Sequence, residues 1–148
     1  MTTQFFQRDA NHVPITNLGL TETKTITYVA GTTGAIATTT LFTVTGTVAI
    51  NVFGICTTDL TSGGASTIEV GTATSTACLA DQVTSTTIDN HEVYHDAVLA
   101  VGGQVAGHTH VVDEDVIQTV AAATITAGVI QWYCTWTPLS EDGNVVAT

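Results

Sequence analysis

The chain has 148 residues, a formal net charge of −11 and only two basic residues, Arg8 and Lys24. Nucleic acids and anionic membranes are bound through basic patches, which two cations cannot form, so the composition excludes both partners. Threonine alone supplies 32 residues, and with valine and isoleucine it favours an all-β protein, because β-branched side chains suit a pleated sheet.

Charged residues make up only 10 % of the chain, whereas roughly 25 % is typical of globular proteins. This deficit suggests that partners cover much of the surface. The three cysteines, Cys56, Cys78 and Cys134, show no metal-ligand spacing and are expected to be free thiols in a reducing cytosol. No signal peptide and no apolar run long enough to span a bilayer is visible.

Residues 1–22 are expected to form an extended N-terminal arm, since their pattern has neither a helical nor an alternating period. Residues 23–148 are expected to form one β-sandwich domain. The arm either lies over a neighbouring molecule or caps its own sandwich. The residues expected to make the contact are Phe5, Phe6, Arg8, Leu18 and Leu20.

From residue 25 the pattern predicts a jelly roll or β-sandwich of about eight to ten short antiparallel strands, separated by glycine-rich turns. Residues 47–72 read as a hairpin that turns near residues 59–65, and residues 90–96 as a loop. The other expected strands are residues 25–29, 40–45, 75–79, 83–88, 98–101, 104–106, 108–112, 116–120 and 130–137.

The last of these strands has the clearest alternation, and Pro138 should end it because proline cannot donate to the ladder. Trp132 and Trp136 share the face with Ile130 and Cys134, which favours the core. The alternative is a carbohydrate- or receptor-binding module in which Trp132, Trp136 or Tyr94 lies exposed as a platform.

A second alternative is a cupin-type metal site. Gly102, His108, His110 and Glu114 resemble the first half of the cupin signature, and the two imidazoles of an HxH strand point the same way. The glycine that closes the cupin motif is replaced by Ala121, and no histidine follows His110. We therefore expect no metal here, but a polar strand face or turn with His108 and His110 solvated or at a subunit contact.

Two further polar clusters are read as surface features. His91 and His95 would share a face on either a helix or a strand, but a solvated loop is favoured over a metal or pH-sensing site. Residues 113–115 are three consecutive acids without the alternating spacing of an EF-hand loop, so we expect an exposed turn rather than a calcium site.

Most of residues 40–147 carries a further resemblance. The chain resembles the decoration, or cement, proteins of tailed-bacteriophage capsids in size, β-character and lack of catalytic motifs. The segments that carry the resemblance are residues 41–46, 71–73, 125–133, 136–140 and 142–147.

This resemblance implies a non-enzymatic virion protein without cofactor, made in the host cytoplasm and bound to the outer capsid surface. Its implied partners are the major coat protein and further copies of itself, commonly in a homotrimer. Such a protein clamps neighbouring coat subunits, and many modest contacts sum to mechanical stability.

Overall fold

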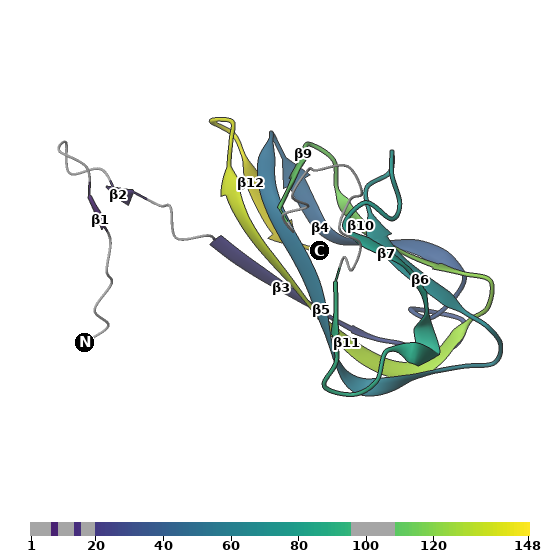
Figure 1. Ribbon diagram of the computed structural model, residues 1–148. Coiled ribbons are helices and arrows are strands. Elements are labelled where there is room, and N and C mark those ends of the chain that lie inside the picture. The colour runs from purple at the N-terminus through teal and green to yellow at the C-terminus, as the bar shows by residue number, and fades with distance from the viewer. Residues whose placement is uncertain (1–6, 9–13, 16–19, 96–108) are drawn as a thin grey trace, which may run out of the picture.

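The computed structural model describes residues 7–8, 14–15, 20–95 and 109–148 (Figure 1). Within these residues, strands predominate and the helical structure is limited to one 3-10 turn, η1 (Ser85–Thr87). The predicted all-β sandwich is confirmed: ten strands form two antiparallel sheets.

The first sheet, called sheet I, has the order β3-β11-β5-β8, and β9 also pairs with β5. The second, sheet II, has the order β12-β4-β10-β6-β7. The strands of sheet I are β3 (Leu20–Thr27), β11 (Ile125–Pro138), β5 (Val48–Ser62), β8 (Val93–Tyr94) and β9 (His110–Val112). Those of sheet II are β12 (Asn144–Ala147), β4 (Ala37–Thr45), β10 (Val116–Ala121), β6 (Thr67–Gly71) and β7 (Ala80–Thr84). Two shorter strands, β1 (Gln7–Arg8) and β2 (Pro14–Ile15), pair with each other.

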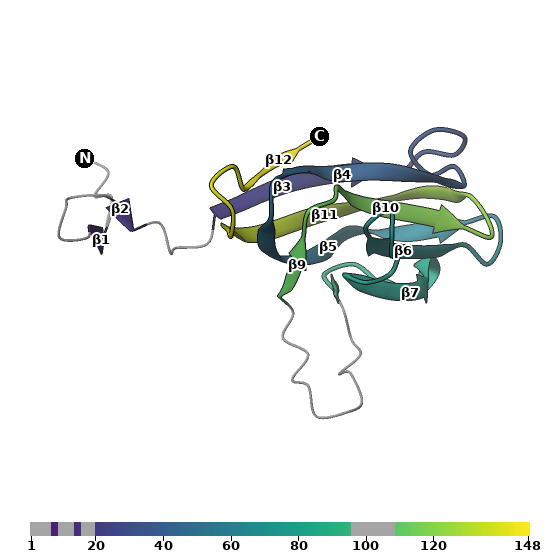
Figure 2. The ribbon, with the colours of Figure 1, turned by 90° about the horizontal axis from the view of Figure 1, so that it is seen from above.

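The two sheets face each other across one hydrophobic core, and β3 and β12 run along the same side of the sandwich (Figure 2). Alternation supplies this core, since every second side chain of a strand points to the same face. In β5 the residues from Val48 to Cys56 alternate strictly between buried and half-buried. Trp132 in β11 is completely buried, and Gly54 makes room for it: a Cβ at Gly54 would lie 2.9 Å from the indole ring.

The core contains one polar cluster. Gln118 in β10 is 1 % exposed, and its Oε1 accepts hydrogen bonds from the Tyr28 hydroxyl at 2.6 Å and from the Trp132 indole at 3.1 Å. Burial raises the pKa of the Tyr28 phenol far above its ordinary value, so this hydroxyl stays a donor. The cluster ties sheet II to sheet I through the middle of the sandwich.

Several predicted elements differ from the structure. The hairpin over residues 47–72 is wrong, because β5 continues to Ser62 and the chain then crosses to β6 in the opposite sheet. A period of two predicts which face of a strand is buried, but it does not predict which strand pairs with it. β3 begins at Leu20, so residues 20–22 of the expected arm belong to sheet I.

Smaller differences concern sheet II and the C-terminus. Residues 75–79 form turns rather than a strand, because Gly71 and Thr72 pack against the returning backbone at Ser75. The strand expected at residues 83–88 lies at Ala80–Thr84, followed by η1. β12 was not predicted. The strands expected at residues 98–101 and 104–106 lie outside the described residues.

Candidate interaction surface

Most of the outward side of sheet I is uncharged, and we call this uncharged part the outer face. The exposed Asp59 lies beyond it on β5. β3 contributes four exposed threonines at alternate positions, which lie opposite outward residues of β11. Outward residues of β11 lie in turn opposite outward residues of β5. Its residues are Thr21, Thr23, Thr25 and Thr27 of β3, Gln131, Tyr133, Thr135 and Thr137 of β11, Ala49, Asn51, Phe53 and Ile55 of β5, Val93 of β8 and Val111 of β9. None of these residues carries a formal charge.

The apolar centre of the outer face is a pair of stacked rings. Phe53 and Tyr133 lie opposite each other in register, with ring centroids 5.1 Å apart and planes inclined by 9°. Both side chains are half-buried. Val93, opposite Ile55, is 53 % exposed, and Val111, opposite Ala49 at the other end of the face, is 65 % exposed. Exposed apolar groups gathered on one face are typical of an interaction site.

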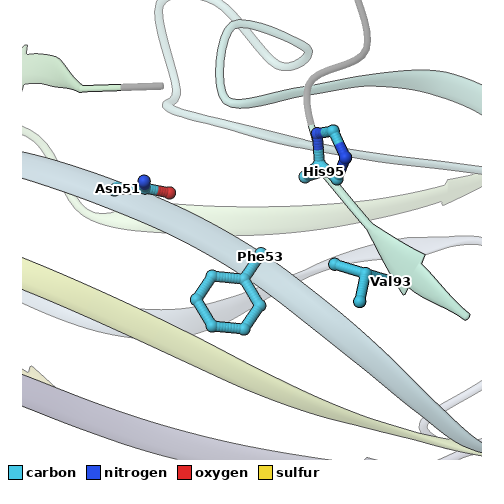
Figure 3. A pocket seen from close by; sticks show the side chains of 4 residues that line it. All are labelled: Asn51, Phe53, Val93 and His95. Carbon is cyan, nitrogen blue, oxygen red and sulfur yellow. The ribbon is translucent and has the colours of Figure 1, made fainter. Parts of the chain in front are cut away.

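A hollow of about 280 Å³ opens beside the stacked rings (Figure 3). Asn51 and Phe53 line it from β5, and Val93 and His95 line it from β8 and the residue that follows it. A smaller hollow of about 110 Å³ lies further along β5 and β11, lined in part by Ala49, Thr109 and Thr137. The outer face is therefore a lightly indented, uncharged sheet surface.

Most acidic residues of the described chain lie in loops, and backbone N–H groups donate to several acids, including Asp59 of β5. The N–H and hydroxyl of Thr74 both donate to the Glu114 carboxylate, the N–H at 3.0 Å. The Val44 N–H donates to Asp115 at 2.9 Å, and the Asn90 N–H donates to Asp59 at 2.6 Å. The Thr74 hydroxyl, with smaller contributions from its N–H, holds the pKa of Glu114 below its ordinary value.

These contacts correct the expected exposed turn at residues 113–115. Asp113 is exposed, but Glu114 and Asp115 are only partly so, because their carboxylates accept backbone hydrogen bonds from the loop after β6 and from β4. The two carboxylates thus tie this turn to the loop after β6 and to β4.

The expected interface residues are only partly covered by the structure. Phe5, Phe6 and Leu18 lie outside the described residues, and Arg8 lies in β1, paired with Pro14. Leu20 lies in β3 opposite Trp136 and is 40 % exposed. The contact assigned to these residues stays a prediction.

The metal candidates do not assemble within the described part of the chain. His110 lies in β9 opposite Ile50, and Glu114 is hydrogen-bonded to Thr74, while His108 lies outside the described residues. No group of three His, Cys, Asp or Glu side chains there is placed to hold a metal ion. His91 and His95 are both exposed, on either side of β8.

The aromatic platform of the carbohydrate alternative is wrong for the residues that it named. Trp132, Trp136 and Tyr94 are at most 6 % exposed, because all three point into the core. The Tyr94 hydroxyl donates to the carbonyl of Ile68 at 3.0 Å, and its ring meets the edge of Trp132.

Cys56 and Cys134 are buried free thiols, and burial raises the pKa of Cys134 to about 12.

Comparison with family models, curated proteins and solved structures finds no match. The described residues contain no helix long and apolar enough to cross a membrane. Sequence reasoning missed the outer face as a site, although its signal is present: the outward residues are uncharged in β3, in β11 and in β5 from Ala49 to Ile55.

Proposed function

We propose that this protein is a non-enzymatic structural protein of a virion, which binds the outer surface of a capsid and stabilises the contacts between coat subunits. The observation that carries the proposal is the uncharged outer face of sheet I in a chain that holds 13 acidic residues. A surface without charge can be desolvated against another protein at little electrostatic cost.

The strand order offers a second support. Without β12, the order β3-β11-β5-β8 faces β4-β10-β6-β7, and each connection from β3 to β6 crosses from one sheet to the other. We infer that this is the eight-stranded arrangement of a jelly roll, an architecture used in viral capsids and also in lectins and cupins. The fold is therefore compatible with a virion protein, and the choice among these classes rests on the surface.

The sequence resemblance to capsid decoration proteins points the same way. A capsid presents many copies of one site, so a modest interface on each copy sums to a large stabilisation. Each contact is expected to bury roughly 1,000 Å² or more. The outer face, with its threonine border and aromatic centre, is the part of the described surface that suits such a contact.

Co-sedimentation with purified capsids tests the proposal. We expect the parent chain to pellet with capsids, and Phe53→Asp to lose this binding because it places a charge at the centre of the outer face. The matched control is Thr45→Asp, which adds the same charge at an exposed position of β4 in sheet II. A parent chain that stays in the supernatant contradicts the function, and equal binding by both variants contradicts the surface.

The N-terminal arm is tested separately. Because β3 begins at Leu20, removal of residues 1–19 leaves the sandwich strands complete. We expect the shortened chain to keep its β-rich circular-dichroism spectrum and to bind capsids more weakly. Binding equal to that of the full chain would remove the arm from the contact.

A further inference from the structure

β3 is the outermost strand of sheet I, and its free edge is long and regular. Among the described residues it pairs with β11 alone, through eight consecutive residues without a bulge. Neither proline nor glycine interrupts it, and its outward side chains are all threonine. An edge of this kind exposes a row of backbone groups that can pair with another strand.

The register shows which backbone groups point to the free edge. The Tyr28 N–H donates to the carbonyl of Gly128 at 2.9 Å, so in this antiparallel pair the even-numbered residues of β3 bond to β11. The N–H and C=O groups of Thr21, Thr23 and Thr25 therefore point away from β11. The Thr27 carbonyl already accepts a hydrogen bond from the Thr33 hydroxyl at 2.6 Å, which marks the end of the available edge.

The sequence of this edge is nearly symmetric about Thr23. The run Leu20-Thr21-Glu22-Thr23-Lys24-Thr25-Ile26 places like residues at equal distances on either side, except that Glu22 mirrors Lys24. If two such strands pair antiparallel with Thr23 opposite Thr23, then Glu22 of each copy lies opposite Lys24 of the other. Lys24 is one of only two basic residues in the chain.

We propose that the partner of this edge is a second copy of the chain, whose β3 pairs antiparallel with the first about a two-fold axis through Thr23. The two copies of sheet I then form one continuous sheet. The pairing is isologous, as two-fold contacts are: if residue i of one copy contacts residue j of the other, then residue j of the first copy contacts residue i of the second.

Backbone geometry and charge agree on this register. Thr21 with Thr25, and Thr23 with Thr23, are hydrogen-bonded pairs, because their free groups face the edge. Glu22 with Lys24 then falls in the closer, non-hydrogen-bonded position, where opposite charges across strands attract. Two copies that each carry a charge of −11 repel in most orientations, and this register brings two unlike pairs together.

The inference does not depend on the proposed function, and the two fail separately. The register predicts a dimer with twice the 15.3 kDa mass of one chain, whereas the resemblance to decoration proteins implies a trimer. Sedimentation equilibrium of the full chain distinguishes them, and a monomer or a trimer overturns the pairing. Capsid binding is measured independently of this mass.

A cysteine cross-link tests the register. Thr23→Cys should form a covalent dimer on mild oxidation, because the Cα atoms of a hydrogen-bonded pair lie about 5.5 Å apart, within the range of a disulfide. The matched control is Thr25→Cys, whose copies lie about 14 Å apart in this register and should not cross-link. Both variants are made with Cys78→Ser, since the other two cysteines are buried. Equal cross-linking at both positions overturns the register.

Charge reversal tests the contact between Glu22 and Lys24. Glu22→Lys and Lys24→Glu each place like charges opposite each other and should weaken dimerisation at least tenfold. An equimolar mixture of the two variants restores both unlike pairs and should form a heterodimer close to the parent in affinity. Glu141→Lys, an exposed loop change of the same sign as Glu22→Lys, should dimerise like the parent. A mixture that stays monomeric overturns the proposal.

Discussion

At the scale of single residues, Gln118 joins the two sheets through its carbonyl oxygen. Gln118→Leu would leave the Tyr28 hydroxyl and the Trp132 indole as buried donors without an acceptor, and each costs about 1–3 kcal/mol. The substitution also removes the Gln118 Nε2, which has no partner among the described residues. We therefore expect the free energy of unfolding to fall by about 2 kcal/mol, measured by denaturant titration. Tyr28→Phe should lower the free energy of unfolding less in the Gln118→Leu variant than in the parent chain. Additive losses of unfolding free energy would contradict the cluster.

The Glu114 carboxyl should make the stability of the fold depend on pH. Hydrogen bonds from Thr74 lower the pKa of its carboxyl in the folded state, so the carboxylate stabilises the fold above its ordinary pKa of 4.5. This stabilisation is lost as the pH falls through the lower folded-state pKa. Glu114→Gln should therefore unfold at lower denaturant concentration than the parent at neutral pH, with the difference closing in acid. Glu141→Gln, at an exposed loop position, should follow the parent, and a constant gap at every pH would contradict the role of the carboxylate.

At the scale of elements, period-two patterns placed the middle of β5 and of β11 and their buried sides, but not the full extent of β3, β5 or β11. Ile130, Trp132, Cys134 and Trp136 are all buried in β11, as their alternation predicts, and β11 ends at Pro138. The pairing of strands was not predictable in this way. β5 and β6 are neighbours in sequence and both alternate, yet they lie in different sheets. The outer face depends on that pairing, because it assembles residues from strands more than 80 positions apart, and so sequence reasoning found its parts without finding the surface.

The register of β11 against β5 shifts around Gly128, and an alternating sequence pattern does not reveal this bulge. Gly128 has φ of +121°, and a Cβ there would lie 2.5 Å from the Leu60 side chain and 2.7 Å from the Asp59 carbonyl. Gly128→Ala combines backbone strain with overpacking, so we expect a loss of about 2 kcal/mol or more in the free energy of unfolding. Gly63→Ala, where a Cβ would meet nothing within 4 Å, is the matched control and should change stability little. Equal effects in thermal or denaturant unfolding would contradict a specific role for the bulge.

At the scale of the whole molecule, most of the acidic charge lies away from the outer face. Seven of the described acidic residues lie in turns between strands: Asp89, Glu92, Asp113, Glu114, Asp115, Glu141 and Asp142. The residues named above for the outer face carry none, although Asp59 lies exposed further along β5. The acidic loops keep the chain soluble and hold copies apart in most orientations, while the neutral face can approach another protein without that repulsion.

This separation predicts how capsid binding responds to salt. Contacts between exposed charges weaken as ionic strength rises, because the screening length falls from about 14 Å at 0.05 M to about 4 Å at 0.5 M. A contact made through the uncharged outer face should keep its affinity within about threefold over that range, since few charged pairs are broken. Phe53→Asp should remain defective at every salt concentration. Binding that collapses between the two conditions would instead place the contact on the acidic loops and a cationic partner surface.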